Sequence, residues 1–374
     1  MLIPFDDYPV HQSSQPLAHP ISGDRNTYDR YFFNGYDRAG QTMFGAALGL
    51  YPNRQVIDGA FSVVRDGVQR SVYASGRLPA DRTRTVIGPI AVEVREPMRR
   101  LRVRIDAADL GITADLEFLA RSVAVQEPHF LLHDGPSVLF DYTRLTQFGC
   151  WQGWFSVDGH TTEVSPGSFL GSRDRSWGVR PVGEPPGGAP SHTLPQFFWL
   201  WAPLNFEDHL IHVDVNEDAD GRRWHQTAVL LPTLADPASS DPCDDRVVTA
   251  MRSLAWSIDW QPGTRRARAA SLTLEGWDGS SRRVELTPLL TFQMRGLGYL
   301  NPEWSHGTWK GELVVGSESW VLDELDPLDI ANLHVQQLVR ATDGDQVGIG
   351  VLEQLVINEH RPSGLQGFLE GAPG

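Results

Sequence analysis

The chain has 374 residues, 41% of them hydrophobic, which is enough for about two globular domains with substantial cores. Its net charge is −15, and Lys310 is its only lysine. Because nucleic-acid binding depends on clustered lysine and arginine, this charge argues against a nucleic-acid partner.

The first residues lack the basic region and the long apolar region of a signal peptide, so we expect a cytoplasmic protein. No apolar run of about 20 residues occurs, and we therefore expect no integral membrane segment. With only Cys150 and Cys243, a disulfide framework and a cysteine-based zinc motif are both ruled out. The sequence gives no prediction of oligomeric state.

Short segments of alternating apolar and polar residues recur along the chain and predict an all-β fold with little helix. Asp-Gly pairs between these segments suit the positive φ angles of tight hairpin turns. The best helix candidate is residues 317–325, which open with a serine cap and end before Pro327. The clearest predicted strands are residues 90–94, 101–105, 210–215 and 313–315, and the clearest turns are Asp66-Gly67, Asp220-Gly221, Asp278-Gly279 and Asp343-Gly344.

Residues 171–180 are unusually rich in charge, with three arginines, one aspartate and one tryptophan. In a strand, Arg173, Arg175 and Trp177 would point to one face. Asp174 would then point to the other face, between two serines. This pattern indicates either a structural arginine–carboxylate clasp at a domain junction or a functional site.

The segment Arg173-Asp-Arg-Ser-Trp-Gly178 is followed by an aromatic strand at residues 197–201 and a hairpin segment at residues 209–214. Together they resemble the Asp-Arg-x-Trp signature of the AttH-like and carotenoid 1,2-hydratase (hydroxyneurosporene synthase) family. The resemblance covers roughly residues 30–365, and the C-terminal half is more similar to an uncharacterised bacterial branch. It implies a tandem lipocalin-like, or calycin, pair of barrels. Ser176 stands where relatives usually carry Glu or Gln, so no role is carried over to it.

We expect two tandem lipocalin-like antiparallel β-barrels, one over residues 1–150 and one over residues 191–374. The junction, residues 151–190, contains the arginine-rich motif. A weak internal repeat supports this division, because each half places an aromatic strand before an Asp-Gly hairpin. Closure into barrels also removes exposed sheet edges.

Five residues are candidates for acid–base catalysis. His212 and Asp214 share one face of a predicted strand, so Asp214 could raise the pKa of His212, or the two could form a hydrogen-bonded pair on a solvated face. Glu303 and His306 lie in a turn-rich loop of the kind that carries binding residues. Asp174 is the fifth candidate. The spacing of these residues does not form a metal motif, and we predict no metal site.

Aromatic residues near these candidates are expected to line an apolar pocket. Trp199 and Trp201 share one strand face, which is presented either to a cavity or to the core. The candidate ligand-binding residues are Trp177, Trp199, Trp201, Trp304, Arg173, Arg175 and Tyr142.

The chain lacks the glycine motifs of nucleotide binding, a His-Glu-x-x-His motif and a Gly-x-Ser-x-Gly elbow, so we expect no cofactor. The family resemblance implies a cofactor-independent lyase, hydratase, isomerase or cyclase acting on a hydrophobic, isoprenoid or terpenoid-like molecule. Asp174 or Asp214 would protonate an alkene, and the indoles would stabilise the cation. The alternatives are a non-catalytic lipid or terpenoid carrier and an interaction module with a filled barrel.

Overall fold

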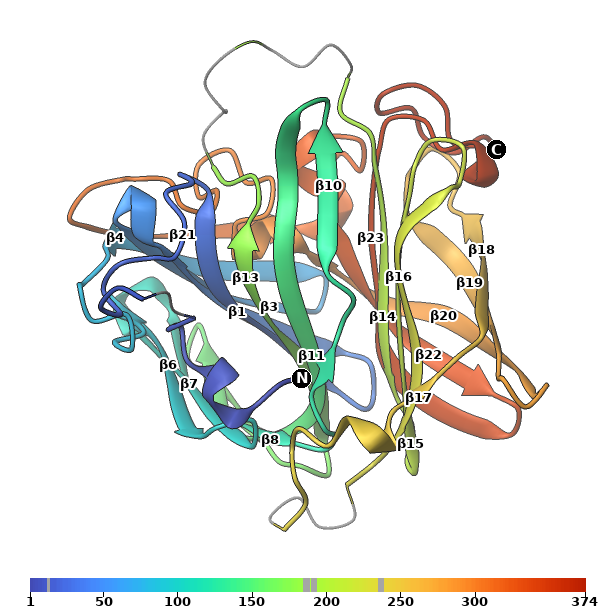
Figure 1. Cartoon of the computed structure of the whole chain (residues 1–374), viewed down its shortest axis with the longest axis horizontal. Coiled ribbons are helices and arrows are strands. Elements are labelled where there is room, and N and C mark those ends of the chain that lie inside the picture. Colours follow the sequence, from blue (N-terminus) through green and yellow to red (C-terminus); the bar gives the residue numbers. More distant parts are fainter. Residues whose placement is uncertain (12–13, 184–188, 190–193, 235–238) are drawn as a thin grey trace.

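The computed structural model describes residues 1–11, 14–183, 189, 194–234 and 239–374. These residues form antiparallel β-structure with a few short 3₁₀ helices. Two strongly curved sheets stand against each other, the first drawn mostly in blue and green and the second mostly in yellow to red (Figure 1). The predicted fold, two tandem lipocalin-like antiparallel barrels with little helix, is confirmed.

The first sheet contains 14 strands among the described residues, in the order β21-β4-β3-β2-β1-β13-β11-β8-β7-β6-β5, and β9, β10 and β12 also pair with β11. Its strands are β1 (Thr27–Asp37), β2 (Thr42–Tyr51), β3 (Val56–Arg65), β4 (Val68–Arg77), β5 (Val86–Ile87), β6 (Ile90–Glu96), β7 (Arg100–Ala107), β8 (Ile112–Ala120), β9 (Val125–Gln126), β10 (Phe130–Asp134), β11 (Ser137–Val157), β12 (His160–Val164), β13 (Phe169–Val179) and β21 (Leu313–Val321).

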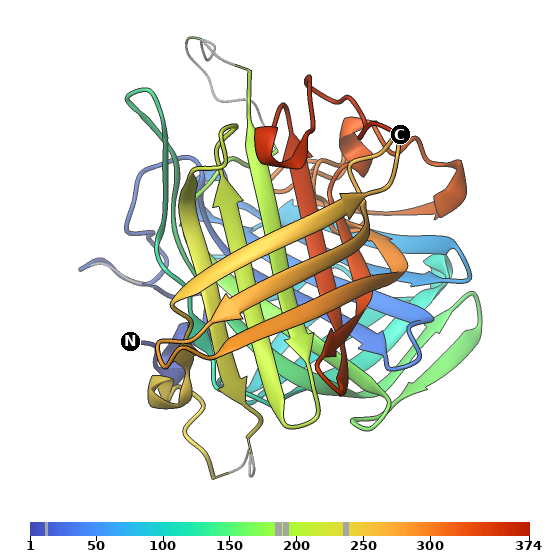
Figure 2. The same ribbon diagram turned by 90° about the vertical axis from the view of Figure 1, so that its right-hand side faces the viewer.

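The second sheet contains nine strands in the described part of the chain, in the order β17-β16-β15-β14-β23-β22-β20-β19-β18. It curls so strongly that the gold and orange strands cross in front of the yellow-green and red ones (Figure 2). Its strands are β14 (Phe197–Asn205), β15 (His209–Glu217), β16 (Arg223–Pro232), β17 (Thr249–Ala250), β18 (Ser253–Trp260), β19 (Ala267–Glu275), β20 (Ser281–Gln293), β22 (Val335–Asp343) and β23 (Gln346–Ile357).

The 3₁₀ helices connect strands or lie near the chain ends, and no helix among the described residues is long and apolar enough to cross a membrane. They are η1 (Pro4–Asp7), η2 (Pro52–Arg54), η3 (Ala108–Leu110), η4 (Asp245–Val247), η5 (Met294–Leu297), η6 (Leu322–Glu324), η7 (Ile330–Asn332) and η8 (Arg361–Ser363).

The four predicted hairpin turns all connect consecutive antiparallel strands. Asp66 and Gly67, for example, have φ angles of 51° and 74°, as the turn between β3 and β4 requires. The predicted helix at residues 317–325 is wrong. These residues continue β21, which pairs with β4 at the edge of the first sheet, and only Leu322–Glu324 form a helical turn.

The first sheet extends beyond residue 150, because β11 ends at Val157 and β13 occupies the position between β1 and β11. It also takes in β21 from the second half of the sequence. Residues 12–13, 184–188, 190–193 and 235–238 of the predicted domains and junction lie outside the described residues.

Three large apolar cores and two smaller clusters stabilise the described part of the protein. Phe33 belongs to the core inside the first barrel, and Phe198 belongs to the core inside the second. Between the sheets lies a third core, in which Phe32 of β1 packs edge-on against Trp201 of β14 at 6.2 Å. Because side chains alternate along a strand, each central strand contributes to a barrel interior with one face and to this intersheet layer with the other.

Candidate functional site

Polar and charged side chains gather in the intersheet layer where β13 lies between β1 and β11. Asn34 Nδ2 of β1 donates a hydrogen bond of 3.2 Å across the layer to Gln336 Oε1 of β22, which shows how closely the two sheets approach. The cross-strand rows on this face are Phe32–Asp174–Thr146, Arg30–Ser176–Arg144 and Tyr28–Gly178–Tyr142.

Asp174 is the unpaired acid of this layer. Its carboxylate forms no hydrogen bond or ion pair with any described residue, and its side chain is only partly buried, so water can reach it. Burial raises the pKa of Asp174 to about 6, although the positive charges of Arg144 and Arg30 oppose the shift. An acid with this pKa can both hold and release a proton near neutral pH.

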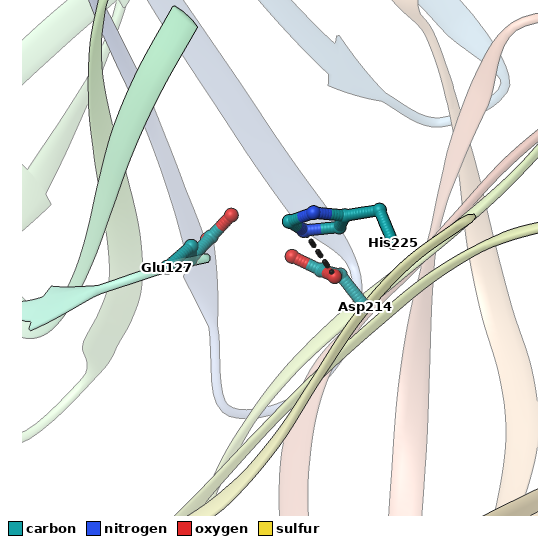
Figure 3. A group of neighbouring side chains, drawn as sticks. All are labelled: Glu127, Asp214 and His225. Carbon is teal, nitrogen blue, oxygen red and sulfur yellow. Dashed lines mark ion pairs between the residues drawn. The ribbon is translucent and has the colours of Figure 1, made fainter. Parts of the chain in front are cut away.

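A network of buried ionisable groups lies beside Asp174. Arg144 Nε donates to Glu127 Oε2 at 2.6 Å, and Arg144 Nη2 donates to Asp214 Oδ2 at 2.7 Å. His212 Nε2 lies 2.9 Å from Glu127 Oε1, and His225 Nε2 lies 3.0 Å from Asp214 Oδ1 (Figure 3). Each carboxylate thus has one imidazole, and the two share one guanidinium.

This pairing corrects the predicted partnership of His212 and Asp214. The two side chains do share a face of β15, but His212 Nε2 is 3.9 Å from Asp214 and binds Glu127 instead. Both side chains are fully buried, which excludes a pair on a solvated face.

The surroundings shift the pKa values of the two carboxyls of the network in opposite directions. Burial alone would raise the pKa of Glu127, but the charge of Arg144 and the hydrogen bond from His212 hold it well below its usual range. Burial and the negative charge of Glu127 raise the pKa of Asp214. Glu127 is therefore the carboxyl that favours the ionised form, whereas Asp214 is the carboxyl whose protonated form is favoured by its surroundings.

Glu127, Asp214 and His225 are the group best placed to hold a metal, because one ligand atom from each lies within 4.8 Å of the others. Arg144, however, already binds both carboxylates. A metal ion would have to compete with this guanidinium, so the donor set fits an internal cation better than a divalent ion.

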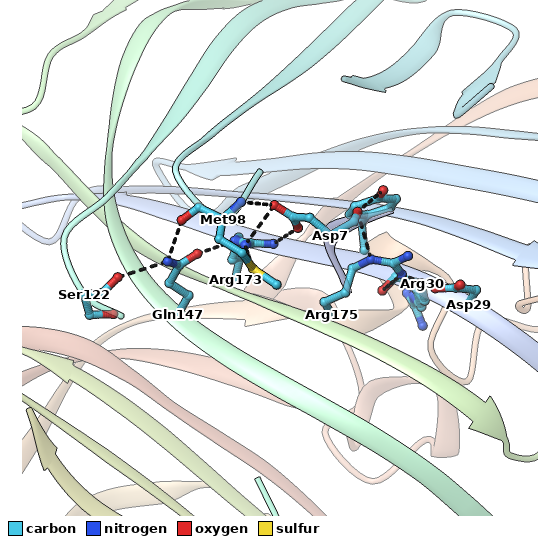
Figure 4. Close-up of polar contacts among 9 residues, drawn as sticks. Asp7, Asp29, Arg30, Met98, Ser122, Gln147, Arg173 and Arg175 are labelled. Carbon is cyan, nitrogen blue, oxygen red and sulfur yellow. Dashed lines mark hydrogen bonds and ion pairs between the residues drawn. The ribbon is translucent and has the colours of Figure 1, made fainter. Parts of the chain in front are cut away.

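The arginines of the charged segment lie on the opposite face of β13 and hold the N-terminal segment in place (Figure 4). Arg173 Nη1 donates to Asp7 Oδ1 of η1 at 2.7 Å, and Arg175 pairs with Asp29. Both arginines are fully buried. The predicted carboxylate partners exist, but they belong to the N-terminal segment and β1 rather than to a junction between the two halves.

Trp177 lies on the same face as these arginines and stacks on His11, with ring centroids 3.9 Å apart. Burial would lower the pKa of His11, but hydrogen bonds to Asp29 and Asp6 raise it overall. Arg173, Arg175 and Trp177 thus form a structural clasp, away from the intersheet layer that contains Asp174.

His306 is at the intersheet layer, but both of its ring nitrogens are occupied. Nε2 lies 2.8 Å from the carbonyl of Leu297, and Nδ1 lies 3.0 Å from Arg30 Nη1. Because a carbonyl only accepts and a guanidinium only donates, His306 is the neutral Nε2–H tautomer. Burial and the charges of Arg30 and Arg180 hold its pKa well below the usual value. His306 therefore positions Arg30 and is poorly placed to transfer protons.

The other residues of the predicted loop are nearer the surface. Glu303 is exposed and pairs with Lys310. Trp304 stacks on Tyr73 at 5.2 Å and lines, with His306, a cavity of about 10 Å³. This cavity holds about one water molecule, so the loop does not provide a ligand pocket of its own.

The predicted aromatic residues Trp199, Trp201 and Tyr142 do reach the intersheet layer. Trp199 lies under the guanidinium of Arg144 at 4.6 Å, and its indole nitrogen donates to Glu353 Oε1 at 2.9 Å. Tyr142 stacks on Phe130 at 4.4 Å. The indole nitrogen of Trp201 is buried without a hydrogen-bond partner.

Several residues of this layer were not predicted from the sequence, namely Arg30, Glu127, Phe130, Arg144, Arg180, His225, Tyr299 and Glu353. They come from strands and loops far apart in the sequence. Alternation along β11 could have placed Tyr142 and Arg144 on one face, but no sequence signal pairs Arg144 with Glu127 and Asp214.

The fold and the intersheet layer define an all-β protein of two lipocalin-like sheets that enclose an acid–imidazole network. The sequence matches a family of unknown function, DUF8625, over residues 2–366, and the chain belongs to this family. A search of curated proteins gave no match.

Solved structures share the fold, among them the following two. An AttH-like protein from Nitrosomonas europaea has 15% identity and a TM-score of 0.54, and the match covers 88% of this chain and 92% of that protein. Kievitone hydratase from Nectria haematococca has 13% identity and a TM-score of 0.51, with 87% and 88% coverage. At this identity the similarity concerns the fold alone.

Proposed function

We propose that the protein is a cofactor-independent enzyme of the hydratase, lyase or isomerase type, acting by acid–base chemistry on a hydrophobic small molecule in the intersheet layer. The observation that carries the proposal is Asp174, an unpaired carboxyl that water can reach and whose pKa is about 6. A carboxyl with a structural role in a partly buried position is normally paired, because an unpaired charge away from bulk water is costly.

Acid–base chemistry requires a general base beside the general acid, and the carboxyl–imidazole pairs of the layer can supply it. His225 lies 3.0 Å from Asp214, and His334 Nε2 lies 2.6 Å from Glu353 Oε1. A carboxylate close to an imidazole can serve as a general base for water that adds to the substrate. A carrier needs no such pairs, so their presence favours an enzyme over a carrier.

Aromatic side chains support an apolar substrate. Phe140 of β11 and Phe197 of β14 are half-buried, with ring centroids 5.8 Å apart, and Phe197 lies 6.4 Å from Trp224 of β16. Tyr142 follows Phe140 two residues further along the same face. An apolar substrate that lies along this row of side chains would contact aromatic rings over its whole length. A terpenoid-like skeleton is the substrate class that we favour.

In the proposed reaction, Asp174 transfers its proton to one carbon of a double bond. The electron pair of the double bond forms the new C–H bond, and the neighbouring carbon becomes electron-deficient. Water then adds there and loses a proton to a carboxylate–imidazole pair, or a neighbouring C–H bond breaks and returns the proton to Asp174. The first course is hydration and the second isomerisation, and neither needs a redox partner.

Kievitone hydratase, a protein with a similar fold, is named as a hydratase. We therefore favour hydration over isomerisation as the proposed reaction. The cytoplasmic location and the relationship to a bacterial branch of the AttH-like proteins are part of the proposal. Both cysteines are free thiols, as a reducing compartment would keep them.

The test is turnover of a panel of terpenoids and related unsaturated compounds by the parent protein and by Asp174→Asn. The substitution keeps the shape of the side chain but removes its transferable proton, so we expect kcat to fall by about 10²- to 10⁴-fold while binding survives. Asp106→Asn is the matched control, since Asp106 is exposed on β7 of the same sheet.

Full turnover by Asp174→Asn would refute the role of Asp174, and Asp214→Asn would then be examined in the same assay. If members of the panel bind tightly and none is turned over, the protein is a carrier rather than an enzyme.

A further inference from the structure

Arg30 is a buried cation that forms no close ion pair, although its charge acts to lower the pKa values of Asp58 and Asp174 nearby. It is 2% exposed, and its hydrogen bonds go to neutral acceptors, His306 Nδ1 at 3.0 Å and the carbonyl of Leu297 at 3.4 Å. Its Nε is buried without a hydrogen-bond partner. The described residues include no carboxylate within 4 Å of its guanidinium.

Other deeply buried arginines among the described residues have an ion pair or a full set of backbone acceptors, although Arg175 Nη2 also lacks a hydrogen-bond partner. Arg144, Arg173 and Arg175 each bind a carboxylate. Arg265 lacks one, but its Nε, Nη1 and Nη2 all donate to backbone carbonyls of the C-terminal part of the chain. Arg30 differs from these arginines because it combines the lack of an ion pair with a free donor, which a folded protein normally avoids.

Arg180 adds a second unpaired cation to the same layer. It follows β13 with the same side-chain alternation as Asp174 and Ser176, and it lies over the rings of Tyr28 and Tyr299 at 5.3 and 5.7 Å. Arg30 lies 4.4 Å from the same Tyr299 ring. No ion pair engages Arg180 among the described residues, and its side chain is half-buried. The two guanidiniums thus converge on Tyr299 at the accessible end of the layer.

The strand between these cations carries small residues. Ser176 is the cross-strand partner of Arg30 and Arg144, and Gly178 is the partner of Tyr28 and Tyr142. Gly178 has φ +138°, and a Cβ there would lie 2.3 Å from the carbonyl oxygen of Asp141. Because these residues are small, no bulky side chain of β13 separates the two guanidiniums, of which Arg180 is half-buried and Arg30 is 2% exposed.

We infer that the substrate carries an ionised oxygen group, a carboxylate or an ionised enol or phenol, which binds to Arg30 and Arg180 above Ser176 and Gly178. This inference rests on the proposed function and adds the substrate class: an apolar skeleton with one acidic oxygen group. Guanidiniums bind such oxygens through paired, charge-assisted hydrogen bonds. His306 holds Arg30 for this purpose without neutralising it, because it is itself uncharged.

The inference also removes a difficulty in the chemistry. Protonation of a double bond generates positive charge, and two unpaired guanidiniums nearby would oppose it. A bound anion balances them before the proton is transferred. The same group fixes the orientation of the substrate, with its acidic end at Arg180 and its double bond towards Asp174.

The test uses two probes of nearly equal shape, naphthalene-2-carboxylate and naphthalene-2-carboxamide, and calorimetric titration near pH 6. We expect the carboxylate to bind the parent protein at least about tenfold more tightly than the amide, as one charge-assisted hydrogen bond would give. Arg180→Gln should abolish most of this preference, and so should Arg30→Gln if it folds. Arg283→Gln, at an exposed arginine of β20, should leave it unchanged.

Equal affinities of the parent protein for the two probes, or no binding of the carboxylate at millimolar concentration, would overturn the inference. An unchanged preference in Arg180→Gln would overturn the assignment of the site. Asp174→Asn separates this inference from the proposed function, because it should lose turnover and keep the preference for the carboxylate. A preference for the carboxylate in a protein that turns nothing over would support the anion site and refute the enzyme.

Discussion

Replacement of Arg173 by Met tests whether the charged segment is a structural clasp. Met keeps an apolar side chain of similar reach but leaves Asp7, which is fully buried, without its cation. It also removes the donor that satisfies Gln147 Oε1 at 2.9 Å. Breaking a buried ion pair by removing one partner costs about 3–5 kcal/mol, because the remaining charge is uncompensated.

The matched control is Arg100→Met, since Arg100 is half-exposed in its 2.9 Å pair with Glu117 on the same sheet. Exposed pairs contribute only about 0.2–1 kcal/mol. Urea titration gives the free energy of unfolding of each variant. The double variant Asp7→Asn/Arg173→Met should recover part of the loss, because it no longer buries an unpaired charge. A loss in Arg173→Met no larger than that in Arg100→Met would refute the reasoning.

Three further predictions concern stability. The pKa of Asp174 is raised to about 6 from 3.8, so the parent loses stability as pH rises from about 3.8 to about 6, and the loss is complete above pH 6. Asp174→Asn should therefore be about 1–3 kcal/mol more stable than the parent at pH 8 and close to it in stability at pH 4. Equal stability of the two proteins at both pH values would contradict the shift. The pKa of His11 is raised overall, so the stability that protonated His11 contributes is complete below its unfolded pKa of 6.5 and is lost as pH rises through its folded pKa. The parent should therefore lose stability relative to His11→Gln between pH 5.5 and pH 8.5. A constant difference in free energy of unfolding over this range would exclude the linkage. Gly178→Ala should lower the free energy of unfolding by at least about 2 kcal/mol, because its Cβ would clash with the backbone of Asp141; an unchanged urea midpoint would show that the strands can separate there.

The fold was predictable because its signals are local. Asp-Gly turns and period-two alternation identify hairpins without knowledge of distant contacts, and the turn at Asp66-Gly67 has the expected positive φ angles. The helix predicted at residues 317–325 is wrong because the serine cap is a local signal, and non-local strand pairing outweighs it. Residues 317–321 pair with β4 and so belong to the first sheet.

The candidate site was predictable only in part. Alternation placed Asp174 opposite Arg173 and Arg175, and placed Trp199 and Trp201 on one face, as the structure shows. The partners of these residues were not accessible to such reasoning. Arg144 and Asp214 are 70 positions apart, and Arg30 and His306 are 276 apart, so only the packing of the two sheets brings them together.

The pH dependence of kcat/KM, for the first compound that the protein turns over, tests the central claim most directly. If Asp174 is the general acid, kcat/KM should fall about tenfold per pH unit above a pKa near 6, because the proton to be transferred is then missing. Asp174→Asn should lower kcat/KM by about 10²- to 10⁴-fold and remove this limb of the profile, while Asp106→Asn keeps both rate and profile. A profile in Asp174→Asn that matches the parent in rate and in pH midpoint would contradict the account.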